Sequence, residues 1–316
     1  MKYKSIDPSI FKFINEANEL FPQKPYEIGA TKSREIFSKH SESLYQKRTN
    51  KISVIDDYFK TENKIVKIRL YKPNNNDKAS AGMIYIHGGG WIMGDLNSHD
   101  SVCVDLSINC NIIVISIDYS LSPEHPYPIA LNECYSLYLQ YLNKTNFFKN
   151  LNLNNILIAG DSAGGNLSAA LNLKIKKEHL PLPKGQILIY PCLSLDFNSY
   201  SYLKYSDAPI LDRKTMIWFW ENYLGKNLNS TNPNAVPELE EDLYGLPDTV
   251  VCTAEIDPLA SDGIKFINKL NDKFVDNVHI HAKNLVHGFI RFREEGSPSE
   301  HYFQLICKEI SKIIKK

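Results

Sequence analysis

From Met83 onward the chain alternates short apolar runs with stretches of helical periodicity, a pattern that few folds accommodate. The helical stretches include Pro128–Asn143 and Ala163–Glu178. The apolar runs are Met83–Ile86, Ile112–Ile117, Ile156–Ala159, Gln186–Tyr190, Val250–Ala254 and Val278–Ala282. Strands without polar alternation are buried on both faces, and helices between such strands connect them in parallel. The sequence therefore predicts an α/β fold with a central, mostly parallel sheet and helices on both of its faces.

Three other parts of the chain depart from this pattern. Residues 51–60 and 64–73 alternate apolar and polar side chains around a short turn, which predicts an antiparallel hairpin. Residues 1–50 have helical periodicity, and a Tyr- and Asn-rich insertion contains an expected helix at Arg213–Tyr223. We therefore divide the chain into an N-terminal helical part (1–50), a core (51–194 and 235–316) and an insertion (195–234).

The charge balance and composition disfavour several classes of protein. The 316 residues contain 36 Lys and Arg against 36 Asp and Glu, so the net charge offers no general attraction to nucleic acid or anionic membranes. No apolar stretch approaches the roughly 18 residues of a membrane span, and the N-terminus lacks the apolar core of a signal peptide. The six cysteines show no metal-ligand spacing. We therefore predict a cytoplasmic protein with reduced cysteines and with neither a metal nor an organic cofactor.

The strongest chemical signal is a GxSxG motif formed by Gly160, Ser162 and Gly164. A buried strand runs into this motif and a helix follows at once, so the serine is expected in a tight, strained turn. The two glycines leave room for backbone segments that would otherwise collide. The amide of Ala163 would then lie at a helix N-terminus, where negative charge is favoured. The motif predicts a nucleophilic serine at the carboxyl end of the sheet.

The second signal is the loop His87-Gly88-Gly89-Gly90-Trp91, directly after an expected strand. Three consecutive glycines cost ordering entropy, but they bring bare backbone amides close to a ligand. With the Ala163 amide, those of Gly88, Gly89 and Gly90 could hold the oxyanion of a tetrahedral intermediate. The alternative is a phosphate-binding turn, although the spacing fits neither GxGxxG nor GxxxxGK[ST]. We expect His87 to organise the loop by hydrogen bonding.

A nucleophilic serine needs a base, and the base needs an orienting acid. His287 lies in a loop after the last expected strand and is followed by glycine, which suits a base presented over the sheet edge. His279 and His281 are competitors, but they alternate within a strand. Asp257 is the favoured acid because it lies in the turn after a strand, whereas Glu255 lies within or at the end of that strand.

This combination resembles the bacterial hormone-sensitive-lipase-like esterases, an α/β-hydrolase family that includes acetyl esterases. The motifs that carry the resemblance are HGGGW at 87–91, GDSAGGN at 160–166, DPL at 257–259 and HGF at 287–289. Residues 118–128 are similar to the family stretch YRLAPEHPFP, and residues 94–100 are closer to the acetyl-esterase branch. One departure is the segment DPLASDG at 257–263, which reads DPLRDEG in the family and so loses a positive charge near the acid.

The resemblance implies an α/β-hydrolase fold in which the N-terminal helices and the 195–234 insertion form a helical cap over the site. It also implies a catalytic triad of Ser162, His287 and Asp257. The oxyanion amides would be those of Gly89, Gly90 and Ala163.

We therefore predict hydrolysis of short-chain acyl esters, acetyl to butyryl, through an acyl-enzyme intermediate. Two aromatic residues next to the motifs, Trp91 and Phe289, are predicted to bind substrate and to limit the length of the acyl chain. An amidase or peptidase with the same triad is the nearest alternative, and a non-catalytic binding protein on this fold is another. The expected partner is a small-molecule ester. A homodimer and a regulatory protein partner are left open.

Overall fold

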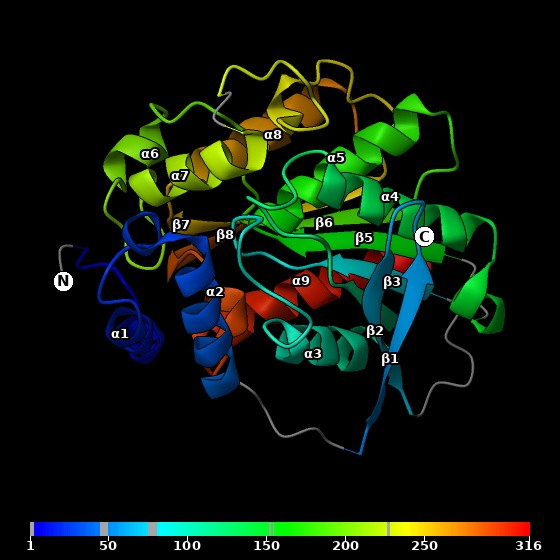
Figure 1. Ribbon diagram of the computed structural model, residues 1–316, viewed down its shortest axis with the longest axis horizontal. Helices are drawn as coiled ribbons and strands as arrows, with labels where there is room; N and C mark the ends of the chain where they lie inside the picture. Colours follow the sequence, from blue (N-terminus) through cyan, green and yellow to red (C-terminus); the bar gives the residue numbers. More distant parts are fainter. Residues whose placement is uncertain (1–2, 45–49, 75–80, 152, 154, 226–227) are drawn as a thin grey trace.

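The computed structural model describes residues 3–44, 50–74, 81–151, 153, 155–225 and 228–316. Its centre is an eight-stranded sheet in the order β1-β2-β4-β3-β5-β6-β7-β8 (Figure 1). The strands are β1 Ile52–Lys60, β2 Ile65–Pro73, β3 Ala81–Ile86, β4 Ile113–Ile117, β5 Asn155–Asp161, β6 Gly185–Ile189, β7 Asp248–Ile256 and β8 Asn277–Val286. From β4 to β8 every neighbouring pair is parallel, whereas β1 and β2 pair with their neighbours in antiparallel fashion. The predicted α/β fold with an entry hairpin is confirmed.

Helices cover both faces of the sheet. One face packs against α3 and α9, and the other against α4, α5 and α8 (Figure 1). The α-helices are α1 Phe11–Leu20, α2 Pro25–Ser43, α3 Asp100–Cys110, α4 Ile129–Leu142, α5 Ala163–Lys177, α6 Tyr200–Lys204, α7 Arg213–Leu224, α8 Ala260–Asp272 and α9 Pro298–Lys315. Four short 3-10 helices are η1 Pro8–Ile10, η2 Asn146–Asn150, η3 Pro237–Leu239 and η4 Phe289–Arg291. Each strand at the centre of the sheet is buried throughout, as its uninterrupted apolar run predicts.

The four remaining helices come from the two segments that were predicted to lie outside the core. Helices α1 and α2 belong to residues 1–50, and α6 and α7 belong to residues 195–234. Helix α2 begins at Pro25 and bends at Gly29, where the backbone is in the left-handed region (φ 80°). Helices α2 and α7 pack against each other at one side of the molecule (Figure 1). Two segments far apart in sequence therefore meet at the same place.

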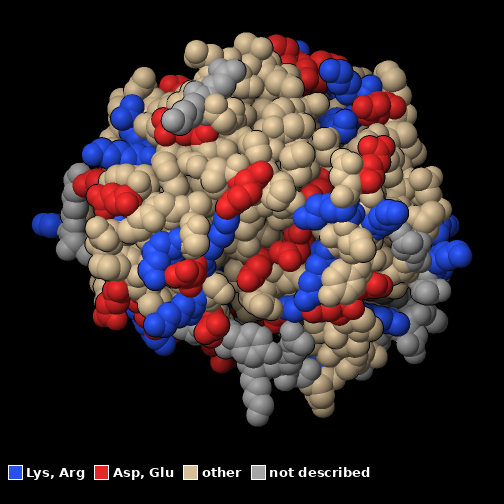
Figure 2. Space-filling model, viewed as in Figure 1, with Lys and Arg blue, Asp and Glu red and all other residues tan. Residues whose placement is uncertain are grey.

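The exposed surface mixes charges of both signs. Figure 2 shows Lys and Arg side chains interspersed with Asp and Glu over the viewed face, in agreement with the balanced composition. Among the described residues, none of the helices combines the length and apolar character needed to cross a bilayer.

Candidate active site

Ser162 lies in a tight turn between β5 and α5, as the GxSxG motif predicts. Its backbone is strained, with φ 55° and ψ −118°. Backbone segments cross so closely at this turn that a side chain would not fit. A Cβ added to Gly164 would lie 1.9 Å from the carbonyl oxygen of Ile86. A Cβ on Gly160 would lie 2.4 Å from the carbonyl oxygen of Gly164. The two glycines are therefore required by packing at the turn that presents the serine.

His287 and Asp257 form a continuous hydrogen-bonded chain with Ser162. The Nε2 atom of His287 is 2.9 Å from Ser162 Oγ, and its Nδ1 atom is 2.7 Å from Asp257 Oδ2. Asp257 is fully buried, and its other oxygen accepts the amide hydrogen of Leu259 at 2.9 Å. An imidazole that donates Nδ1–H to a carboxylate keeps the Nε2 lone pair directed at the hydroxyl. This arrangement can deprotonate the serine as it attacks a carbonyl carbon.

The competing acid and bases lie elsewhere. A carboxylate oxygen of Glu255 accepts the amide hydrogen of Asn284 at 2.8 Å. His279 Nε2 and His281 Nδ1 lie 2.9 Å and 3.1 Å from the hydroxyl of Thr253. Their contacts place all three away from the serine, which leaves Asp257 and His287 as the pair beside it.

The glycine loop presents two amides to the same site. Gly89 and Gly90 have φ values of 120° and 62°, which a side chain would strain, and both line the cavity above Ser162. Within the described part of the chain, their amides and that of Ala163 donate no hydrogen bond to the protein. The prediction for Gly88 needs correction, because its amide donates to Asp161 Oδ1 at 3.0 Å and is not available to a substrate.

Asp161, which precedes the serine, is a buried carboxylate whose importance the sequence did not indicate. Besides the Gly88 amide, it accepts hydrogen bonds from Tyr85 Oη at 2.8 Å, His99 Nε2 at 3.3 Å and Tyr190 Oη at 3.4 Å. Burial alone would raise its pKa, but the charge of His99, the hydrogen bonds and the charge of Arg291 outweigh burial and hold the pKa of Asp161 well below its usual range. The ring of Tyr190 also packs against the His287 imidazole, with ring centroids 4.5 Å apart.

His87 organises the glycine loop rather than reaching the serine. Its Nδ1 atom is 2.8 Å from the carbonyl oxygen of Gly88, and its ring stacks on Tyr119 with centroids 4.2 Å apart. Burial, reinforced by neighbouring His99, lowers the pKa of His87 to about 4, so the ring is neutral at neutral pH. These contacts agree with the role expected from the sequence.

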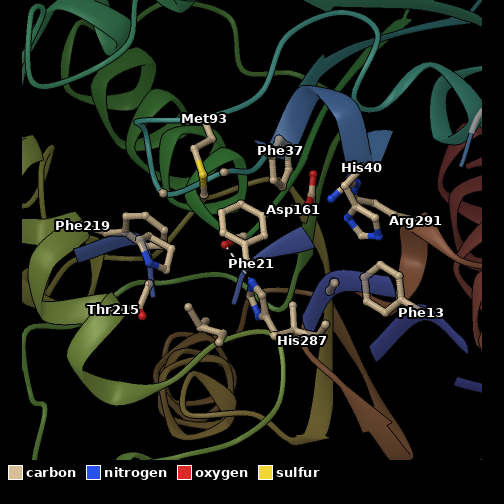
Figure 3. Close-up of a pocket in the computed structure, with 18 of the residues that line it drawn as sticks. Phe13, Phe21, Phe37, His40, Met93, Asp161, Thr215, Phe219, His287 and Arg291 are labelled. Carbon is tan, nitrogen blue, oxygen red and sulfur yellow. Dashed lines mark hydrogen bonds between the residues drawn. The ribbon is translucent and has the colours of Figure 1, made fainter. Parts of the chain in front are cut away.

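A cavity of ≈ 120 Å³ opens onto Ser162 (Figure 3). Helices α1, α2 and α7 form much of its wall, together with the loops that follow β3, β5 and β8. The side chains labelled in Figure 3 include Phe13, Phe21, Phe37, His40, Met93, Asp161, Thr215, Phe219, His287 and Arg291. The wall is largely apolar and aromatic near the serine, which suits the carbon chain of a small ester.

Neither predicted substrate-binding aromatic lines this cavity. Trp91 is fully buried and stacks on Tyr223, with centroids 4.2 Å apart and planes 3° apart. Phe289 is also fully buried and packs edge-on against Tyr190 at 5.6 Å. Both belong to the apolar core, and this corrects the prediction. The aromatic ring beside the oxyanion glycines is instead Phe219 of α7, whose ring lies 2.4 Å from a Cβ built on Gly90.

Sequence reasoning missed the basic side chains in the cavity wall, among them His40 and Arg291. Arg291 follows His287 by four residues and interrupts an otherwise apolar stretch, which is the one signal that pointed to it. His40 has no such signal, because it reaches the site only through the folding of α2. Among the described residues, no group of three or more His, Cys, Asp or Glu side chains is placed to hold a metal ion.

The family model of the alpha/beta hydrolase fold matches residues 83–291. The chain belongs to this family. This α/β-hydrolase is 36% identical to the esterase LipI of Mycobacterium tuberculosis over 229 residues, covering 71% of each chain. It is 33% identical to the carboxylesterase NlhH of the same organism over 230 residues, covering 72% of each chain.

Solved structures place this α/β-hydrolase in the same group. A hyperthermophilic esterase from the archaeon Pyrobaculum calidifontis superposes with a TM-score of 0.90 at 28% identity, covering 98% of this chain and 99% of the archaeal one. The resemblance to hormone-sensitive-lipase-like esterases is thereby confirmed, and the protein is a serine hydrolase of the esterase type.

Proposed function

We propose that this hydrolase cleaves carboxylic esters of short acyl groups, acetyl to butyryl, with Ser162 as nucleophile, His287 as base and Asp257 as orienting acid. The observation that carries the proposal is the hydrogen-bonded chain from Ser162 Oγ through His287 to Asp257. Nucleophile, base and orienter within hydrogen-bond reach of one another are the signature of an activated serine.

In the first half of the reaction, Ser162 Oγ attacks the ester carbonyl carbon while His287 Nε2 takes the hydroxyl proton. The carbonyl oxygen becomes an oxyanion, and the amides of Gly89, Gly90 and Ala163 are the donors that would stabilise it. When the intermediate collapses, the bond between the former carbonyl carbon and the oxygen of the alcohol part breaks. His287 gives the proton to that oxygen, and the alcohol leaves. The acyl group remains on the serine.

In the second half, water takes the place of the alcohol. His287 accepts a proton from the water, whose oxygen attacks the acyl carbon and regenerates the same oxyanion geometry. Collapse of that intermediate releases the carboxylic acid and returns the proton to Ser162. Asp257 stays deprotonated throughout, because its role is to hold the imidazole tautomer and stabilise the imidazolium.

Short acyl groups are favoured by the lining of the cavity. Helices α1, α2 and α7 form much of the wall around Ser162, and the Phe219 ring stands next to the glycine loop. Each methylene that fits contributes about 0.8 kcal/mol, so kcat/KM should rise with chain length until the cavity ends and then fall. We expect the maximum at roughly two to four acyl carbons, with dodecanoyl esters at least ~100-fold poorer.

The test is steady-state hydrolysis of 4-nitrophenyl esters of increasing acyl length by the wild type, Ser162→Ala and Ser168→Ala. Ser168 is the matched control: it is buried one and a half turns further along α5, where its hydroxyl donates to Gly164. Ser162→Ala should lower kcat by ~10⁶ and keep the circular dichroism spectrum of the wild type. Near wild-type turnover in Ser162→Ala would overturn the mechanism, and an optimum at eight or more carbons would overturn the acyl-length assignment.

A further inference from the structure

One side chain in the cavity wall has no role in the ester chemistry described above. Arg291 is 7% exposed, and it lines the cavity that contains Ser162 and His287. It ends η4, the short helix that starts after the left-handed turn at Gly288. The same five-residue segment therefore supplies both the base and a guanidinium to one cavity.

Most of the hydrogen-bonding capacity of this guanidinium is unused. Its Nε donates to the carbonyl oxygen of Ser98 at 3.3 Å, and one Nη donates to Ser41 Oγ at 2.8 Å. Its flat face lies over the ring of Phe37, 4.2 Å from the centroid. A guanidinium carries five N–H donors in a fixed plane, so three of them have no acceptor among the described residues.

Arg291 also has no ionic partner at contact distance. Within the described ranges, no carboxylate oxygen lies within 4.0 Å of its nitrogens, whereas the buried Arg69 and Arg293 each form such a pair. A buried charge without a partner is costly, and folded proteins normally pair it. Asp161 stabilises this charge only from beyond contact distance, so an anionic ligand in contact with the guanidinium would offset more of the cost.

The buried carboxylate whose charge most stabilises Arg291 is that of Asp161, which lines the same cavity but forms no ion pair with Arg291 at contact distance. Both oxygens of Asp161 are occupied by the four donors described above, which hold its charge on the side of Tyr85 and the glycine loop. His40 lies on the same side of the cavity as Arg291 in Figure 3. Burial, together with repulsion by Arg291, lowers the pKa of His40 to about 4, so this ring is neutral at neutral pH. An incoming anion would therefore meet the charge of Arg291.

We propose that the preferred substrates of this site carry a carboxylate, which Arg291 binds while the ester carbonyl lies at Ser162. Figure 3 shows Arg291 and His40 on one side of the cavity, together with Phe13, Phe37 and Asp161. Phe219 and Thr215 lie on the opposite side, with His287 between the two sides. A planar, bidentate guanidinium matches a carboxylate better than any neutral group. The inference rests on the proposed esterase function and specifies its substrate class as small, anionic esters.

The carboxylate could belong to the acyl part or to the alcohol part, and two substrate pairs distinguish these sources. Monoethyl succinate and diethyl succinate test the acyl side through ethanol release. Acetoxyacetate and its methyl ester test the alcohol side through acetate release. For the wild type we expect kcat/KM of the charged member to exceed that of the neutral member at least tenfold in one of the pairs.

Two variants of Arg291 test whether this residue causes the preference for charged over neutral esters. Arg291→Gln should reduce the charged-to-neutral ratio about tenfold or more, and Arg291→Lys, which keeps the charge but loses the planar fork, should give an intermediate ratio. Lys24→Gln is the matched control, because Lys24 is a second cation lining the cavity, pairs with Asp212 at 3.1 Å and is exposed. It should keep the wild-type ratio.

The outcomes separate this inference from the function on which it rests. If neither neutral nor charged esters are hydrolysed, the proposed function fails and this inference fails with it. If neutral esters are hydrolysed but both wild-type ratios are near one or below, only this inference fails. It also fails if Arg291→Gln keeps the wild-type ratio. Should Arg291→Gln not fold, the wild-type and Arg291→Lys ratios decide, together with competitive inhibition of the wild type by butyrate against butyramide.

Discussion

The carboxylate of Asp161 accepts the amide hydrogen of Gly88 at 3.0 Å, so the residue before Ser162 fixes the loop whose amides we propose as oxyanion donors. The serine turn follows β5 and the glycine loop follows β3. These two strands are parallel neighbours, so their carboxyl ends meet at one edge of the sheet. Ser162 and the Gly89 and Gly90 amides, the proposed nucleophile and oxyanion donors, are therefore positioned relative to each other by a buried charge.

We predict that Asp161→Asn damages turnover and stability together. An amide offers one acceptor oxygen in place of two, so at least one of the four donors loses its partner at about 1–3 kcal/mol. A displaced Gly88 would shift the Gly89 and Gly90 amides, and one misplaced donor is worth about 10² in kcat. Kinetics and thermal unfolding measure both effects. Asp196→Asn, which removes a surface pair with Lys265, is the control and should cost less than ~1 kcal/mol. Unchanged kcat in Asp161→Asn would contradict this role.

Substitution of Phe219 should change the acyl-length optimum, whereas substitution of Trp91 should not. Phe219→Ala removes a ring from the cavity wall, and we expect the kcat/KM maximum to move to acyl chains at least two carbons longer. Trp91→Ala instead empties a stacked core position beside Tyr223 and should cost about 3–5 kcal/mol of unfolding free energy. The acyl-ester series and urea denaturation measure the two effects. A longer optimum in Trp91→Ala alone would restore the interpretation made from the sequence.

Arg34 links helix α2 to the glycine loop, and its loss should loosen the cavity. Its Nε donates to the carbonyl oxygen of Ile92 at 2.7 Å, and its other nitrogens bind the Ser122 carbonyl and Glu124. We predict that Arg34→Ala lowers kcat/KM about tenfold and stability by about 1.5–3 kcal/mol. Lys32→Ala on the exposed side of α2 is the control and should stay within ~0.5 kcal/mol. Equal effects of the two substitutions would refute a specific link.

Buried neutral histidines should make stability fall on acidification. The pKa of His40 is about 4 in the folded protein, because of burial and Arg291, against 6.5 for an unperturbed histidine. Between these values the unfolded chain binds one more proton at this site, so stability decreases as pH falls from about 6.5 to 4. Burial raises the pKa of Asp118 to about 6, which acts in the opposite direction below that pH.

A His40→Gln variant isolates the contribution of His40. The difference in unfolding free energy between the wild type and this variant should change with a slope of about 1.4 kcal/mol per pH unit inside that window. It should be flat above pH 7. Chemical denaturation at a series of pH values measures the slope, and a pH-independent difference would show that His40 does not titrate as inferred.

The sequence predicted the sheet well because its information is local. Uninterrupted apolar runs such as Ile156–Ala159 can be buried only between two helical layers, so their position in the chain is enough to identify them as strands. The serine turn was recognised from the local GxSxG motif, and Gly160 acts on the nearby carbonyl of Gly164, whereas Gly164 makes room for Ile86 on a neighbouring strand. Strand ends were less well predicted: β8 runs from Asn277 to Val286, beyond the expected Val278–Ala282. The exposed Lys283 and Asn284 separate its buried last two residues from that run.

The cavity wall was predicted poorly because its information is not local. Trp91 follows the oxyanion glycines in sequence, but its backbone is in the left-handed region (φ 58°), and its ring packs against α7 instead of facing the serine. Arg291 meets Ser41 across 250 positions of the chain, a contact that no local pattern encodes. Side-chain direction in a turn and contacts across such separations require the folded structure.

The joining of α2 and α7 over the cavity has an evolutionary consequence. The groups that would break and form bonds are held by the sheet, whereas the groups that would select a substrate come largely from two helical segments at residues 1–50 and 195–234. Substitutions in those helices can therefore alter which esters enter without disturbing the strained serine turn. Proteins descended from one ancestor with this architecture can therefore diverge in substrate range while the residues proposed for catalysis stay the same.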